Sequence, residues 1–194
     1  MKHVALVLIA IVVTACNPSP RSLKPKKGEA QTAVPKVVNQ LQAGTDPVKF
    51  DALQAFLPTD DFILKDGWRK SDMTGFMLAE PMKGAQASLT LKKPGAEVVI
   101  NIVDTVFSQS LFAPIATFLA DGFSERNATG FKTRITFQGF PAFEEWTSTE
   151  RVAGLTVLVG QRFLVHLQGT SMNGTDPLKA VASQINMTGL ARLK

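Results

Sequence analysis

The feature that most constrains this chain is its single cysteine, Cys16, which comes directly after an apolar run. Residues 4–13 carry no charge, and Lys2 places one positive charge ahead of them. About ten apolar residues cannot cross a bilayer core, which needs roughly 20, but they suit the core of an export signal. Because no disulfide can form within the chain, packing must supply the stability of whatever folds.

The residues that end this run, Val13-Thr14-Ala15-Cys16, resemble the lipobox of bacterial prolipoproteins. That resemblance implies cleavage before Cys16, a diacylglyceryl thioether on its sulfur and acylation of the new amino terminus. Residues 1–15 are then a signal peptide, and the lipid on Cys16 is the contact with the membrane. Two or three acyl chains anchor stably, whereas one binds only marginally. The alternative is an ordinary secretory signal that happens to end near a cysteine.

The same resemblance bears on localisation. It places the protein in the cell envelope, and Asn17 is not the aspartate that usually marks retention in an inner membrane. In an organism with two membranes, we therefore expect the outer membrane, with the folded part facing the periplasm.

Residues 16–45 read as the lipidated cysteine followed by a flexible basic linker, rich in proline and lysine. The formal net charge of the chain is +5, but residues 47–194 hold fifteen basic and fourteen acidic side chains. The excess of positive charge therefore lies beside the predicted anchor. This distribution disfavours nucleic-acid binding, which needs a basic surface on the domain. The linker lysines either contact anionic headgroups or only keep a solvated tether extended.

Residues 46–194 are expected to form a single α+β globular domain. Apolar periodicity, caps and turn residues predict helices over residues 47–57, from Ser108 or Ser110 to about 121, and from Thr175 onward. Period-two alternation predicts strands over residues 68–77, 84–92, 97–104, 131–137, 142–150, 155–159 and 163–168. The fold class that follows is a mainly antiparallel sheet of about six to seven strands with helices packed on it.

This order of elements is similar to the PsbP-like fold. It also resembles small exported bacterial proteins in which a strand ends in Val-Asp-Thr and a Gly-Phe-Pro-Ala turn precedes the closing hairpin. Here those motifs are residues 103–105 and 139–142. The resemblance implies a PsbP-like sandwich and no catalytic residue.

Few residues suggest chemistry. His166 is the one histidine after the predicted cleavage site, and Asp104 ends an apolar strand, where a carboxylate either points into a cleft or accepts backbone hydrogen bonds. Glu144 and Glu145 are adjacent in a presumed strand and should point to opposite faces. Asp60 and Asp61 look like a solvated turn. We expect no metal site, no cofactor and no enzymatic activity.

Aromatic residues are the last signal. Phe140, Phe143 and Trp146 cluster around a predicted turn, and Trp68 lies in the first strand region. If exposed, these side chains would form an apolar binding patch; the alternative is packing at the edge of the core.

Three functions remain open at this point. The first is a membrane-anchored, non-enzymatic binding or accessory module for an envelope protein or a small ligand. The second is a protective or inhibitory lipoprotein that blocks another protein's active site with a rigid loop between residues 139 and 153. The third is an envelope hydrolase that uses Asp104 near His166, which requires both residues to meet in one pocket.

Overall fold

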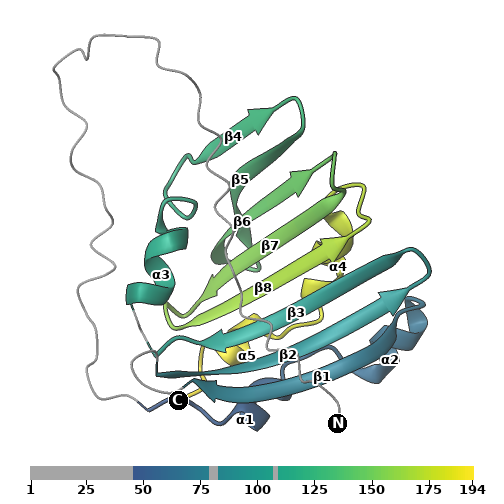
Figure 1. Ribbon diagram of the computed structural model, residues 1–194. Helices are drawn as coiled ribbons and strands as arrows, with labels where there is room; N and C mark the ends of the chain where they lie inside the picture. Colours follow the sequence, from purple (N-terminus) through teal and green to yellow (C-terminus); the bar gives the residue numbers. More distant parts are fainter. Residues whose placement is uncertain (1–45, 79–82, 107–108) are drawn as a thin grey trace, which may run out of the picture. The chain divides into compact units, whose positions relative to one another are not determined.

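The computed structural model describes residues 46–78, 83–106 and 109–194; the predicted signal peptide, Cys16 and the linker lie outside the described residues. The described chain forms one antiparallel sheet of eight strands in the order β1-β2-β3-β8-β7-β6-β5-β4 (Figure 1). The strands are β1 Arg69–Leu78, β2 Gly84–Lys93, β3 Ala96–Asp104, β4 Ser124–Asn127, β5 Gly130–Phe137, β6 Phe140–Thr147, β7 Val152–Val159 and β8 Phe163–Thr170.

Five short helices accompany the sheet: α1 Phe50–Gln54, α2 Asp60–Lys65, α3 Gln109–Ala116, α4 Asp176–Ala182 and α5 Met187–Leu190. Helices α1 and α2 contact the β1–β3 part of the sheet, and α4 and α5 contact β7 and β8. The sequence expectation of a mixed, mainly antiparallel fold with helices packed on the sheet is confirmed.

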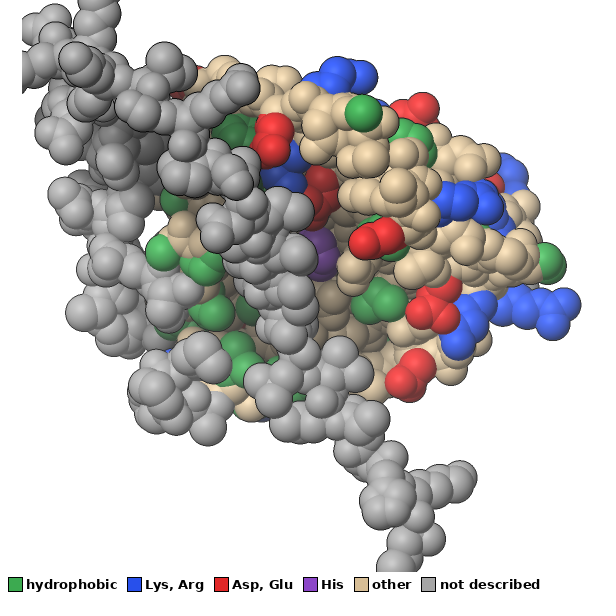
Figure 2. Space-filling model, turned by 45° about the horizontal axis from the view of Figure 1, so that its top comes forward, with side chains coloured by type: hydrophobic (Ala, Val, Ile, Leu, Met, Phe, Trp, Pro, Cys, Tyr) green, Lys and Arg blue, Asp and Glu red, His purple; other side chains and the backbone are tan. Residues whose placement is uncertain are grey.

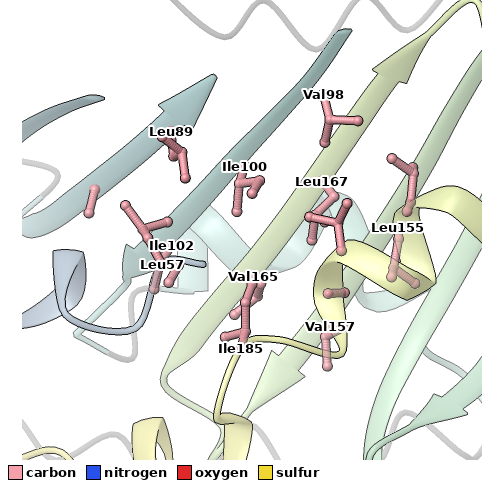
Figure 3. Packing of buried hydrophobic residues seen from close by; sticks show 14 of the residues in the cluster. Leu57, Leu89, Val98, Ile100, Ile102, Leu155, Val157, Val165, Leu167 and Ile185 are labelled. Carbon is pink, nitrogen blue, oxygen red and sulfur yellow. The ribbon is translucent and has the colours of Figure 1, made fainter. Parts of the chain in front are cut away.

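Alternation along each strand gives the sheet two different faces. Ile100 of β3 pairs with Leu167 of β8, which pairs with Leu155 of β7, and all three are fully buried. We call this the helix-covered face. Its apolar side chains join buried residues of α1, α4 and α5 in one core. Figure 3 shows strand residues of this core together with Leu57 and Ile185. We call the opposite surface, which carries Asn101 and His166, the polar face.

The number of strands differs from the expectation of six to seven. The additional strand is β4, which lies between the helix predicted to end near residue 121 and the strand predicted from residue 131. Its four residues, Ser-Glu-Arg-Asn, are all exposed, so they show no apolar alternation that could have revealed a strand. The strand predicted over residues 68–77 corresponds to β1, which runs through Gly75 to Leu78. The resemblance to the PsbP-like fold stays a prediction.

The hairpin turn between β5 and β6 lies at slightly different residues than the sequence predicts. Gln138 and Gly139 both have positive φ angles and connect β5 to β6, so Phe140 and Pro141 belong to the strand and not to the turn. Between the strands predicted over residues 155–159 and 163–168, Gly160 and Gln161 also both have positive φ, the pattern of a type I′ turn.

The helices are shorter than expected. The first predicted helix is the five-residue α1, and Asp60 and Asp61 form the first turn of α2 rather than a separate turn. The last predicted helix ends at Ala182, and Gly189 lies inside a separate helix, α5. Leu178, Val181, Ala182 and Ile185 recur at helical spacing and are all buried.

A buried ion pair ties the beginning of the described chain to the centre of the sheet. The Arg162 guanidinium donates from Nε to Oδ1 of Asp104 at 2.8 Å and from Nη2 to Oδ2 at 2.7 Å. The side chains are 8% and 0% exposed. The backbone amides of Val48 and Val106 donate to the same carboxylate at 2.9 and 3.0 Å. Nη2 of Arg162 also donates to the Asp46 carbonyl oxygen at 3.1 Å.

This arrangement predicts the effect of removing the carboxylate. Asp104→Ala leaves a buried guanidinium without its counter-charge, which typically costs about 3–5 kcal/mol of unfolding free energy. Urea denaturation of both proteins measures the difference. Glu150→Ala, at an exposed position, is the control and should change stability by less than about 0.5 kcal/mol. A similarly small effect of Asp104→Ala would contradict the assigned role of the ion pair.

Candidate functional site

The polar face carries a row of polar side chains across five neighbouring strands. In the register of the sheet, Thr74, Ser88, Asn101, His166 and Thr156 lie side by side. Thr156 is only 5% exposed and Asn101 only 9%. Such polar side chains stay buried only when their hydrogen bonds are made, so this row has a defined structure rather than being a freely solvated surface.

His166 is held by its neighbour on β7. Its Nδ1 atom lies 2.9 Å from the hydroxyl oxygen of Thr156, and the tautomer decides which of the two donates. Nε2 has no hydrogen-bond partner among the described residues. No side-chain nitrogen or oxygen in that part of the chain is both buried and without a partner, so Nε2 reaches the surface. The ring therefore presents one fixed, available nitrogen.

Asn101 lies directly across from His166 on β3. Its Oδ1 accepts from Ser88 Oγ at 2.6 Å and from Gln86 Nε2 at 3.0 Å, and Gln86 also donates to Ser88 at 2.9 Å. These bonds fix the amide plane and leave its Nδ2 group without a partner in the described chain. Because directly paired residues have Cβ atoms about 4.5–5.5 Å apart, the two available nitrogen atoms belong to neighbouring side chains.

An ion pair borders this pair of residues. Glu145 of β6 binds Lys132 of β5 at 2.6 Å between carboxylate and ammonium. Gly154 separates Glu145 from Gln168 in the register, and a Cβ atom at Gly154 would lie 2.9 Å from both Cγ and Oε1 of Glu145. The missing side chain of Gly154 therefore lets Glu145 lie across β7 on the polar face.

The charge state of His166 follows from its surroundings. Burial lowers the pKa of His166 below its ordinary value of 6.5, and the Glu145 carboxylate opposes part of that shift. The imidazole is therefore neutral at pH 7, and Glu145 is paired with Lys132. We call His166, Asn101, Thr156, Glu145 and Lys132 the polar-face site. It offers hydrogen-bonding atoms without a strong net charge.

The four aromatic residues Phe140, Phe143, Trp146 and Trp68 do not share one exposed surface. Phe140 and Trp146 pack against the core from the helix-covered side, and Trp68 is only 2% exposed. Phe143 is on the other face, 4% exposed, and stacks against Phe118 at 5.2 Å between ring centroids. Successive residues of a strand point to opposite faces of the sheet. Phe140 and Trp146 therefore lie on one face of β6, and Phe143 lies on the other.

The two weak polar candidates are not brought together. Asp104 lies on the helix-covered side, where it holds Arg162 and two backbone amides. His166 lies on the polar face. The hydrolase hypothesis required these residues to converge, and they do not. The expectation for Glu144 and Glu145 is confirmed: Glu144 accepts from Thr175 at 2.5 Å on one face, and Glu145 pairs with Lys132 on the other.

The inhibitory-loop hypothesis also loses its structural basis. Most of residues 139–153 form β6 and the start of β7, in the interior of the sheet. The connection between the two strands is the short segment 148–151. No long rigid loop is available at that place.

Sequence reasoning missed most of the polar-face site. Asn101 interrupts the otherwise apolar strand residues 98–103, and Thr156 interrupts residues 155–159. Those two interruptions were the available signal. Gly154 lies outside the strand predicted over residues 155–159, and only the register shows that it lies in β7 beside Glu145.

Other features restrict the kinds of site in the described residues. No group of three or more His, Cys, Asp and Glu side chains there could hold a metal ion. None of the described helices is long and apolar enough to span a membrane. Figure 2 shows acidic and basic side chains interspersed on the face that it draws, without a continuous basic area among the coloured residues.

The chain has a distant structural similarity to a known protein and no match to a protein family. No protein-family profile matches the chain, and no curated protein matches it. Among solved structures, the extracellular domain of PknH from Mycobacterium tuberculosis aligns with 76% of this chain and 100% of its own length. The identity is 13% and the TM-score 0.45.

The lowered pKa of His166 predicts a pH dependence of stability. In the unfolded chain the histidine takes up a proton near pH 6.5, whereas the folded chain resists protonation to lower pH. The unfolded state therefore binds more protons in that window, and stability falls as the pH drops below about 6.5.

Urea denaturation between pH 5 and pH 8 checks this expectation, with His166→Gln as the matched variant. The variant should lose the part of the pH dependence that belongs to the histidine. Parallel pH profiles of the two proteins would show that His166 is not the group responsible.

Proposed function

We propose that this protein is a lipoprotein of the cell envelope, anchored through Cys16, and that its domain is a non-enzymatic binding module. The proposed binding surface is the polar-face site. The ligand is either an envelope protein or a small molecule that presents neutral polar groups. The Asn101–His166 pair carries this proposal, because two fixed side chains each keep a hydrogen-bonding nitrogen available at the surface.

The physical argument rests on pre-organisation. Hydrogen bonds from Gln86, Ser88 and Thr156 hold the Asn101 amide and the His166 imidazole in one orientation. Ligand binding at this site therefore loses little side-chain conformational entropy, because these side chains are already ordered. A site with a neutral histidine and an internally paired Glu145–Lys132 also favours uncharged polar groups, such as peptide amides or hydroxyls, over strongly charged ones.

Membrane attachment is tested at the cysteine. Cys16→Ala should move most of the protein from the membrane fraction to the soluble fraction, because no acyl chain can be attached without the thiol. Fractionation with metabolic palmitate labelling measures this, and Ser19→Ala in the adjacent linker is the control. Membrane binding of Cys16→Ala equal to that of the natural chain would contradict lipid anchoring.

Binding at the polar face is tested by site-directed photo-crosslinking in cells. A photoreactive residue replaces Gln168, which is exposed and lies two residues from His166 on the same face. Gln184, exposed beyond the end of α4, is the matched control because it is also a glutamine. Mass spectrometry should find an adduct at position 168 that is absent at position 184 and that falls several-fold in the His166→Gln background.

Two results would contradict this proposal. One is an identical set of adducts from both positions. The other is an adduct at position 168 that does not respond to His166→Gln, provided that the variant unfolds at the same urea concentration as the parent at pH 7.

A further inference from the structure

The two edges of the sheet differ in a way that the polar-face site does not explain. At one edge, β4 has four residues, two of them charged, all exposed. A short charged strand is a common protection against pairing with another chain. At the other edge, β1 has ten residues, and from Met73 to Leu78 it contains no charge and no proline. Its outer side pairs with no strand among the described residues.

The same strand holds the exposed large hydrophobic side chains of the described chain. Met73 is 47% exposed, Phe76 is 43% exposed and Met77 is 46% exposed. Met73 and Met77 lie on the helix-covered side of the sheet and Phe76 on the polar side. Large apolar side chains on a long, unpaired edge strand are the features of a surface that pairs with another strand.

We propose that the occupant of this edge is a second copy of the chain, with the two β1 strands paired antiparallel about a twofold axis at Gly75. In this register Met73 lies opposite Met77 of the second copy, and Thr74 lies opposite Phe76 of the second copy. A twofold axis perpendicular to the sheet joins equal faces, so the methionines meet on the helix-covered side and the phenylalanines pack on the polar side. The two eight-stranded sheets become one continuous sheet.

The extent of the regular part of β1 favours pairing about Gly75. The ladder with β2 is irregular between Lys70 and Asp72, so the regular part of β1 runs from Asp72 to Leu78. Gly75 is the midpoint of that segment. A twofold axis there uses every regular residue and places Asp72 opposite Leu78, so no like charges face each other.

Helix α1 adds to the same surface. The Phe50 ring lies over Gly75, where a Cβ atom would be only 2.4 Å from its Cδ2. Phe50 is half-buried, so the axis brings two partly exposed rings close to the methionine pairs. A self-pairing surface of this kind is isologous and closes after two copies.

The alternative occupant of an apolar edge on a membrane-anchored protein is the lipid itself. An edge strand carries unpaired peptide N–H and C=O groups, and these are costly in hydrocarbon because nothing there accepts or donates a hydrogen bond. A second strand satisfies these groups and covers the side chains at once. This inference does not depend on what the polar-face site binds.

The test uses two differently tagged full-length chains in the same cells, one with Thr74→Cys and one with Phe76→Cys. Opposite residues of an antiparallel pair have Cα atoms about 4.5–5.5 Å apart, within the range that a disulfide spans. We expect a disulfide-linked heterodimer in isolated membranes, identified by mass spectrometry of the linked peptides. The control replaces Phe76→Cys by Glu125→Cys on the other edge and should give at least tenfold less product.

A second variant tests the side chains. Met77→Lys in both copies places a charge on the edge, where natural proteins use lysine to prevent pairing, and should lower the yield at least tenfold. Position 77 is half exposed, so the variant should fold; Met73→Lys serves if it does not. The proposal is overturned if no heterodimer forms, if Glu125→Cys gives an equal yield, or if both lysine variants leave the yield unchanged. The edge would instead be assigned to lipid by two results obtained together. No heterodimer would form in cells, and the Cys16→Ala chain would bind lipid vesicles but lose that binding when Met77→Lys is added.

Discussion

The buried pair of Asp104 and Arg162 is the interaction on which the arrangement of this domain depends. Removing two charges from water is costly, and the pair is tolerable only because the carboxylate accepts four hydrogen bonds. Those bonds come from the first described segment, from the residues after β3 and from Arg162 directly before β8. One carboxylate therefore fixes where the chain reaches the sheet and how β3 and β8 align at that end.

In the strands β3, β7 and β8, successive side chains point to opposite faces, so apolar and polar side chains lie on different sides of the sheet. On the helix-covered face, alternate positions of β3, β7 and β8 carry buried apolar side chains, and the buried Asp104 at the end of β3 is the charged exception. On the polar face the same strands carry Asn101, Thr156 and His166, which are bonded to their neighbours. A shift of one residue in register would exchange these two sets, so the core and the proposed binding surface are specified by the same pairing.

Much of the fold could be read from the sequence because its central elements obey local rules. The β2–β3 and β7–β8 hairpins alternate clearly, and the buried stripe of α4 has helical spacing. Where the local signal was weak, prediction failed. The β4 strand has no apolar side to alternate, and α2 begins with two aspartates that also suit a turn. The start of β6 was predicted two residues too late because the Gly-Phe-Pro sequence resembles a turn. The turn residues with positive φ are in fact Gln138 and Gly139.

The sequence by itself determined the class of fold, the position of His166 within the strand predicted over residues 163–168, and the expectation of an export signal ending at Cys16. Only the tertiary structure decided what surrounds these residues. The partners of His166 come from other strands, and Asp104 is matched by a residue 58 positions away. Which aromatic side chains are exposed likewise depends on which strands and helices cover them. Local sequence encodes periodicity and turns, but contacts between distant residues exist only once the register of the sheet is set.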